Sequence, residues 1–275
     1  MNRYSLTAAF LLILLLPRIG ESSITVSSLT VRPGEAVLIS VNGGNENKLK
    51  FGKTVLPLFN YGDGTVKCIA GLPLDVAGSI PVSCGKEKVE LVVAKTASGK
   101  LEKLNIPAKE DVDEKRAAAE HEKILKSIAT VTGKKLWAGK FAKPVPGVVK
   151  AAFGVGRIVN GSSGGGHRGV DLAGALGEPV KSAASGIVIY CERTIASGNS
   201  VVVDHGQGVV SVYFHMNSFG VKSGESVKKG QVLGTVGSTG FSTGPHLHWG
   251  VYVFGVCVDP FVFVRKDFFL VYRKR

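Results

Sequence analysis

Histidine and aspartate residues gather in three short stretches in the second half of this 275-residue chain. The stretches are His167-Arg-Gly-Val-Asp171, Tyr213-Phe-His215 and His246-Leu-His248, and they hold four of the six histidines. Two neutral imidazoles and one carboxylate leave the fourth position of a tetrahedral zinc ion open to water, which is the composition of a catalytic zinc site. Two histidines then remain for proton transfer, since the ordinary imidazole pKa of about 6.5 suits neutral pH.

The spacing of these residues fits extended segments. In a strand, residues two and four apart point to the same face, so His246 would project together with His248. By the same rule, His167 would project together with Asp171. Residues 209–215 are mostly β-branched or aromatic and predict a third strand.

The other two histidines have structural interpretations. His121 begins the run His-Glu-Lys-Ile-Leu, which lacks the second histidine of the His-Glu-x-x-His metalloprotease motif and predicts an exposed helix residue. His205 lies in the run Asp-His-Gly-Gln-Gly, which predicts a hairpin turn packed by the imidazole. A single H-x-H or H-x-x-x-D pattern is common by chance, whereas the glycine-flanked combination favours a metal site.

The three stretches and their surroundings resemble the M23 family of zinc metallopeptidases, the LytM or lysostaphin-type peptidoglycan endopeptidases. The resemblance runs from about residue 141 to residue 263. It depends on residues 144–147, 153–154, 160–161, 166–171, 203–206, 227–231, 237–240 and 244–249.

The resemblance implies a role for each residue of the constellation. His167, Asp171 and His248 would bind Zn²⁺, and His215 and His246 would form the catalytic pair. The zinc ion would activate water to hydrolyse the peptide stems that cross-link bacterial peptidoglycan, in cell-wall remodelling. One histidine of the pair would take the water proton and the other would stabilise the oxyanion or protonate the leaving amine, and the order stays open.

Two features bear on whether such a domain is an enzyme. Some M23 members place a tyrosine shortly before the first histidine, but residues 160–166 here are Asn-Gly-Ser-Ser-Gly-Gly-Gly. The tyrosine's role would then fall to another group or to a catalytic histidine. Some M23-like domains have lost metal ligands and act as non-hydrolytic activators or scaffolds for wall amidases. All five positions are intact here, which favours an enzyme.

The first residues and the charge indicate where the protein works. Residues 1–20 combine Arg3, an apolar run and a Pro-Arg-Ile-Gly end, which predicts a secretory signal peptide and a location in the periplasm or cell envelope. The apolar run is too short to span a bilayer, so no transmembrane helix is expected in the mature chain. A formal net charge of +13 favours anionic envelope polymers as partners, and export excludes nucleic acid.

Four cysteines in an exported chain predict two disulfides. Cys68 and Cys84 lie in the N-terminal region and Cys191 and Cys257 in the C-terminal region, so pairing within each region is expected. Buried free thiols are the alternative.

The remaining patterns predict a mainly β fold. Residues 21–107 alternate apolar runs with Gly and Pro turns, which is typical of a small antiparallel β-sandwich. Residues 108–139 predict a linker helix, residues 140–264 an antiparallel β-sheet catalytic domain of LytM type, and residues 265–275 a basic tail. The short connection between helix and catalytic domain predicts that the N-terminal half lies near the cleft and restrains access.

The sequence also predicts the limits of the helix and contains an internal repeat. In the helix, residues 111–114 resemble a capping box, Ile124, Leu125 and Ile128 form one apolar stripe, and Gly133 is the expected stop. Inside the catalytic domain, Gly-Glu-Pro-Val-Lys at residues 177–181 is echoed by Gly-Glu-Ser-Val-Lys at residues 224–228. This internal repeat resembles a lipoyl or biotinyl carrier fold, although a carrier has no use for the histidines.

Overall fold

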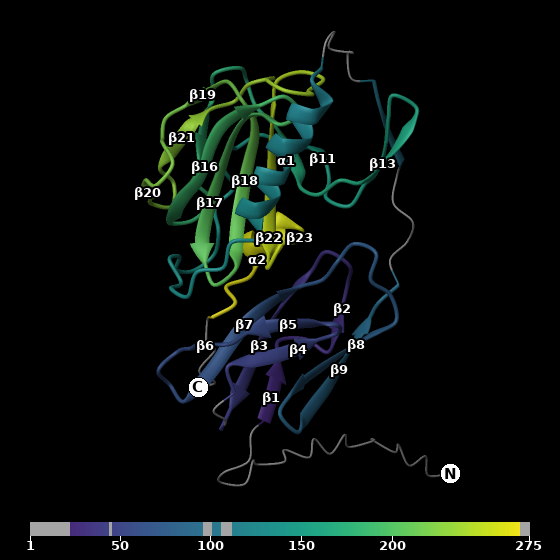
Figure 1. The fold of residues 1–275 in the computed structure, drawn as a ribbon, viewed down its shortest axis with the longest axis vertical. Coiled ribbons are helices and arrows are strands. Elements are labelled where there is room, and N and C mark those ends of the chain that lie inside the picture. The colour runs from purple at the N-terminus through teal and green to yellow at the C-terminus, as the bar shows by residue number, and fades with distance from the viewer. Residues whose placement is uncertain (1–22, 44–45, 96–100, 106–111, 270–275) are drawn as a thin grey trace, which may run out of the picture.

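The computed structural model describes residues 23–43, 46–95, 101–105 and 112–269. The expected signal peptide, residues 1–20, and the expected capping residue Asp111 lie outside these ranges. Nearly all strand pairings are antiparallel, so the fold is mainly β, as the sequence predicts (Figure 1). Within the described residues, no helix has the length and apolar character needed to cross a membrane.

Two sheets form the predicted N-terminal β-sandwich. One contains, in spatial order, β1 (Ser23–Val26), β3 (Ala36–Asn42), β7 (Thr65–Gly71) and β6 (Phe59–Asn60). The other contains β2 (Thr30–Val31), β9 (Glu87–Val93), β8 (Ser79–Cys84), β4 (Lys48–Phe51) and β5 (Thr54–Pro57). Alternate residues of β3, namely Val37, Ile39 and Val41, share one core with Leu49 and Leu91 of the other sheet.

The C-terminal part is built on one large sheet, flanked by two small ones. The large sheet runs β11 (Val149–Ala151), β14 (Val170–Ala173), β22 (His246–Val253), β18 (Val209–Met216), β17 (Gly198–Gly206), β16 (Gly186–Thr194) and β20 (Ser226–Val227), with β23 (Val256–Val258) paired to β22. The small sheets are β15 (Pro179–Lys181), β21 (Val232–Thr235) and β19 (Ser218–Phe219), and β10 (Leu101–Leu104), β12 (Gly156–Val159) and β13 (Ser162–Gly166). The described part of the chain also contains two helices, α1 (Glu114–Ile128) and α2 (Pro260–Arg265).

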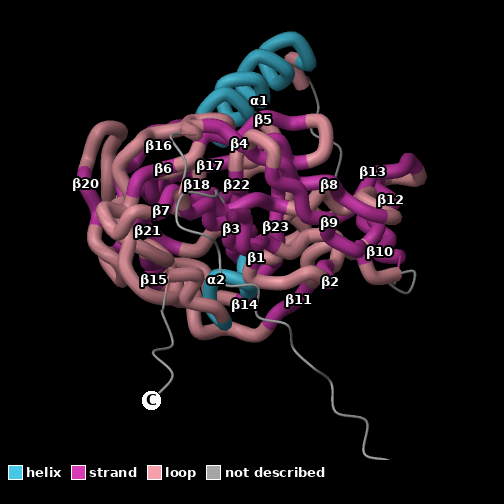
Figure 2. The backbone as a smooth tube through the Cα atoms, turned by 90° about the horizontal axis from the view of Figure 1, so that it is seen from below, coloured by secondary structure: helices cyan, strands magenta, loops and turns pink. Residues whose placement is uncertain are grey.

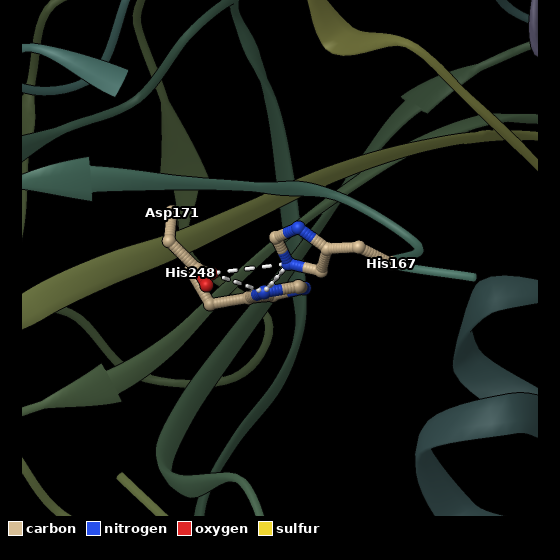
Figure 3. A group of neighbouring side chains, drawn as sticks. All are labelled: His167, Asp171 and His248. Carbon is tan, nitrogen blue, oxygen red and sulfur yellow. Dashed lines mark hydrogen bonds and ion pairs between the residues drawn. The ribbon is translucent and has the colours of Figure 1, made fainter. Parts of the chain in front are cut away.

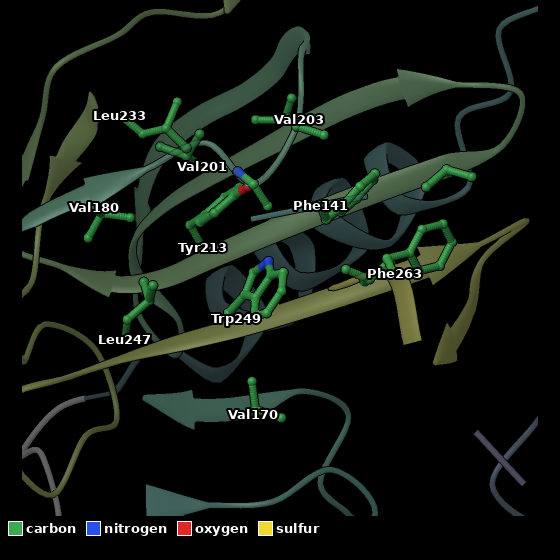
Figure 4. Packing of buried hydrophobic residues seen from close by; sticks show 14 of the residues in the cluster. Phe141, Val170, Val180, Val201, Val203, Tyr213, Leu233, Leu247, Trp249 and Phe263 are labelled. Carbon is green, nitrogen blue, oxygen red and sulfur yellow. The ribbon is translucent and has the colours of Figure 1, made fainter. Parts of the chain in front are cut away.

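The central strands β17 and β18 are buried on both faces, which explains their nearly continuous apolar sequence. On one face, Val201 and Val203 enter the main core, which also contains Tyr213 and Trp249 (Figure 4). On the other face, Val202 belongs to a separate cluster beneath helix α1. The helix therefore supplies the second cover that this sheet needs.

Helix α1 is a strut packed along the large sheet, and Figure 2 shows it outside the layer of strands. Ile124 and Ile128 are buried against the sheet, whereas Leu125 of the predicted stripe is 43% exposed. The helix is shorter than the sequence predicts. Asp113 is its N-cap, with a carboxylate that accepts a backbone hydrogen bond from the first turn, and it ends well before Gly133.

The four cysteines are free thiols, so the predicted disulfides are wrong. Cys191 lies on β16 and Cys257 on β23, with β17, β18 and β22 between them. Strands lie about 4.8 Å apart, so the two residues are separated by about 19 Å, far beyond the ~5.5 Å between the Cα atoms of a disulfide. Cys68 and Cys84 are buried on opposite sheets of the sandwich, and burial raises the pKa of Cys68 to about 12.

In the internal repeat, strands of one copy pair with strands of the other copy. Strand β15 of the first copy pairs with β21 of the second copy, and β16 of the first pairs with β20 of the second. The turns are reciprocal too, because Gly177 N–H donates to Val236 O at 2.9 Å and Gly224 N–H donates to Val188 O at 2.7 Å. The likeness to a carrier fold is therefore a local pairing inside the larger sheet structure.

The sandwich contacts the large sheet directly. The Tyr61 hydroxyl donates to Gln207 Oε1 in the β17–β18 turn at 2.5 Å, and the Tyr61 ring stacks on Phe269 with centroids 5.0 Å apart. Elsewhere, Asp259 N–H donates to Gly34 O at 2.7 Å. These contacts join the sandwich to the C-terminal half of the molecule.

Candidate active site

Strands β14, β18 and β22, together with the bend before β14, bring all five predicted residues together. Asp171 of β14 lies directly opposite His248 of β22 in the antiparallel register. His246 begins β22, and His215 lies near the end of β18, with 5.0 Å between the centroids of their rings. Neighbouring strands thus convert a set of distant sequence positions into one cluster.

His167 is not in a strand, contrary to the sequence-based expectation. It lies in the bend between β13 and β14, and the chain becomes extended again only with β14. The bend requires Gly169, because a Cβ atom there would lie 2.7 Å from Trp249 O and 2.8 Å from the His248 ring. Through this close approach, the His167 ring still reaches Asp171, with 3.1 Å between Nε2 and Oδ1.

Three side-chain atoms form a close triangle (Figure 3). His248 Nδ1 lies 3.0 Å from His167 Nε2 and 2.9 Å from Asp171 Oδ1. Zinc–ligand distances near 2.0 Å place tetrahedral donor atoms roughly 3.3 Å apart, so small shifts would make this triangle fit a zinc ion. Among the residues that the structure describes, no other group of three His, Cys, Asp or Glu side chains has this arrangement.

Polar contacts orient the donors of the triangle. His167 Nδ1–H donates to Ala152 O at 3.0 Å, which leaves Nε2 for a metal. Asp171 directs Oδ1 to both imidazoles, while its Oδ2 accepts a hydrogen bond from Arg157 Nη2. Burial of Asp171 opposes its ionisation, but its polar contacts with the His167 and His248 rings outweigh burial and hold its pKa well below the usual range. The carboxylate is therefore in the ionised form that a metal cation requires.

The two remaining histidines share one orientation. His215 Nδ1–H donates to Thr239 O at 2.9 Å, and His246 Nδ1–H donates to Gly244 O at 2.7 Å. Each neutral ring therefore has Nε2 as its proton acceptor. Burial, with smaller effects from His248 and His246, lowers the pKa of His215 to about 3. His215 also has a backbone φ of 62°, a left-handed conformation that non-glycine residues rarely adopt.

A cleft of about 340 Å³ opens over these side chains. Its wall includes His215, His246 and Asp171, and also Arg157 from β12 and Glu102 from β10. Strand β10 comes from the segment between the sandwich and α1, and it pairs in parallel with β12. Part of the N-terminal half thus lies at the cleft, where the sequence predicts it.

Arg157 and Glu102 are residues of the site that the sequence did not reveal. Arg157 Nε donates to Glu102 Oε2 at 3.1 Å, and Arg157 Nη2 donates to Asp171. The available signal was weak, namely the position of Arg157 between the matched segments 153–154 and 160–161. Glu102 had no signal, because nothing in its spacing relates it to a residue 55 positions away.

The last two histidines lie apart from the cluster. His121 is exposed on α1, as predicted. His205 is a fully buried residue of β17 rather than a turn residue, with Nδ1 2.9 Å from Ser185 O and Nε2 2.7 Å from Ser211 Oγ. Burial lowers its pKa to about 4, so the ring is a neutral core group.

Comparison with known proteins agrees with this geometry. Residues 165–260 match the model of peptidase family M23. The DD-carboxypeptidase/endopeptidase Mpg of Neisseria meningitidis serogroup B is 42% identical over 94 residues, which cover 34% of this chain and 22% of the relative. The peptidoglycan DD-endopeptidase ShyC of Vibrio cholerae is 39% identical over 94 residues, again 34% of this chain and 22% of the relative.

A solved structure extends the likeness beyond the matched segment. The crystal structure of a peptidase M23 from Pseudomonas aeruginosa superposes with a TM-score of 0.64 at 27% identity, over 84% of this chain and 93% of that one. The curated relatives are matched over only about a fifth of their length. With five histidine and aspartate residues in one cluster and a family match over residues 165–260, this chain carries an M23 peptidase domain.

Proposed function

We propose that this protein is a zinc-dependent endopeptidase that hydrolyses peptide cross-links of bacterial peptidoglycan in the periplasm or cell envelope. The observation that carries the proposal is the triangle of His167, Asp171 and His248, with His215 and His246 beside it. Three donors and an open side are the arrangement of a catalytic zinc site. The named activities of Mpg and ShyC support the substrate class.

The side chains divide the chemistry between them. A zinc ion held by His167, Asp171 and His248 would supply Lewis acidity toward the scissile carbonyl and lower the pKa of water. His215 and His246 each present Nε2, because each Nδ1–H is held by a carbonyl. A neutral ring accepts a proton at Nε2 and a protonated ring returns it there, so the pair can take the proton of water and deliver one to the leaving amine.

The substrate bond can be narrowed by the relatives' names. Mpg is named a DD-carboxypeptidase/endopeptidase and ShyC a DD-endopeptidase, so a peptide bond between two D-residues is the bond that we propose for this chain. The non-hydrolytic alternative, an activator or scaffold for amidases, is less well supported, because the triangle and both adjacent histidines are present.

Digestion of purified peptidoglycan tests the proposal. Zinc-loaded protein should release uncross-linked muropeptides, identified by mass, and removal of zinc with a chelator should abolish the products. The His246→Ala variant serves as the inactive control, since its ring lies outside the donor triangle. Bound zinc without any new muropeptide would favour the scaffold alternative.

A further inference from the structure

The cleft beside the triangle carries charges that the hydrolytic step does not use. Arg157 and Lys150 line it as cations, and Glu102 lines it as an anion. The Arg157 side chain is 18% exposed, whereas Lys150 is exposed and reaches only Pro245 O at 3.4 Å. A largely buried guanidinium is the stronger anion site, because its hydrogen bonds are made in a medium of lower polarity than water.

The contacts of Arg157 show two uses of one side chain. Nη2 donates to Oδ2 of Asp171, the oxygen that faces away from the imidazoles. Nε donates to Oε2 of Glu102 at 3.1 Å, so one guanidinium contacts two carboxylates. Arg157 therefore lies beside the metal position, and its Nε–H points to a carboxylate other than that of Asp171.

Glu102 shows what kind of group fits there. It is a carboxylate on an extended segment, β10, which lies along β12 with Glu102 opposite Arg157 in the parallel register. A carboxylate on an extended peptide is also what a peptide substrate with a free α-carboxyl group presents. The Glu102 side chain is 31% exposed, so it meets solvent at the cleft wall.

From this geometry we propose that Arg157 binds the free α-carboxylate of the substrate residue that leaves, and that Glu102 occupies the same site when no substrate is bound. In a peptide ending in D-Ala-D-Ala, this carboxylate is attached to the carbon that carries the scissile nitrogen. Binding at the triangle would therefore bring it next to Arg157. The inference rests on the proposed function and specifies its substrate as a peptide with a free acid directly after the scissile bond.

Matched substrates test the inference. N-acetyl-L-Lys-D-Ala-D-Ala and its C-terminal carboxamide differ only in the charge of the C-terminal group, which Arg157 would bind. We expect the zinc-loaded protein to cleave the acid with the higher kcat/KM, and Arg157→Gln to reduce that preference roughly 10- to 100-fold, the worth of one charged hydrogen bond. Glu102→Gln should lower KM for the acid and leave KM for the amide unchanged. Arg193→Gln, an exposed arginine of β16, is the control and should change neither value.

A binding measurement keeps the test independent of turnover. In an NMR titration of zinc-free protein, the acid should bind more tightly than the amide, Arg157→Gln should remove the difference, and Glu102→Gln should increase it. Equal losses for both peptides in Arg157→Gln would overturn the inference and leave Arg157 as a residue that only positions Asp171. Weaker acid binding in Glu102→Gln, or loss of the preference only in Lys150→Gln, would overturn it as well. Failure of the wild-type protein to cleave peptidoglycan or either peptide would instead refute the proposed function.

Discussion

Substitutions of single histidines in the cluster should differ in their effects on zinc content and on hydrolysis. His248→Ala leaves two protein donors, His167 and Asp171, so zinc content and hydrolysis should fall together. His215→Ala leaves all three donors, so zinc should stay near one per chain while turnover drops roughly 10²–10⁴-fold, the usual effect of losing an acid–base group. Elemental analysis and peptidoglycan hydrolysis, measured on the same samples, give both values.

The exposed His121 provides the matched control for these two variants. His121→Ala should keep both zinc and activity, because its ring lies on the outer side of α1. The assignment of roles would be reversed if His215→Ala lost its zinc while His248→Ala retained it.

His205 makes stability depend on pH without touching the active site. Its pKa is about 4 in the folded protein and about 6.5 when unfolded, so the unfolded chain binds the extra proton first as pH falls. Folding stability should therefore be unaffected above pH 6.5 and decline between about pH 6.5 and 4, by roughly 3 kcal/mol from this residue. Denaturant unfolding of zinc-free protein at several pH values should show a smaller decline for His205→Gln. An identical decline in the variant would assign the pH dependence to other groups.

At the residue level, the sequence was most informative where chemistry restricts the choice of residue. Histidine is rare in this chain, so four histidines in three short stretches gave a strong pattern, and the structure brings them together. Arginine and glutamate are common residues with many roles, so Arg157 and Glu102 form no recognisable pattern in the sequence. Their pairing is set by the register of β10 on β12, which depends on the whole fold.

Helix α1 is the element whose packing can be tested most directly. Ile128→Ala removes a side chain that is 3% exposed and packed on the large sheet, so unfolding free energy should fall by about 2–4 kcal/mol. Leu125, three residues earlier, is 43% exposed, so Leu125→Ala should change the unfolding free energy by less than about 0.5 kcal/mol. Equal losses in the two variants would show that the helix contributes by propensity rather than by packing.

The elements also show where local sequence stops being sufficient. The alternation in β3 and the buried runs of β17 and β18 predict strands because each depends on neighbouring residues. The predicted disulfides were wrong, because the distance between two cysteines depends on strand order. Cys191 and Cys257 occupy one region of the sequence but lie on strands separated by three others. The start of α1 was misplaced by two residues because two aspartates precede the same apolar stripe, and Asp113 is the N-cap.

For the molecule as a whole, the position of β10 bears on the prediction that the N-terminal half restrains access. A fragment of residues 112–269 keeps α1 over its sheet but lacks the sandwich and β10. It should cleave peptidoglycan faster than the whole chain, because Glu102 and Leu104 no longer line the cleft. Specific activity per bound zinc is the quantity to compare. Equal activity would contradict restraint, and a fragment from residue 140 is unsuitable because it would expose the apolar face under α1.

The exchange of strands between the two copies of the internal repeat has a kinetic meaning. Neither β15 nor β16 can complete its pairing until the second copy has been synthesised, because their partners are β21 and β20. The chain between the copies must close as a loop before those contacts compensate for its lost entropy, and such non-local pairing folds slowly. A nascent chain that ends between the copies would carry unpaired strand edges, which makes it a target for chaperones and for aggregation. The strand exchange that joins the two copies is thus also a step at which the growing chain is exposed to aggregation.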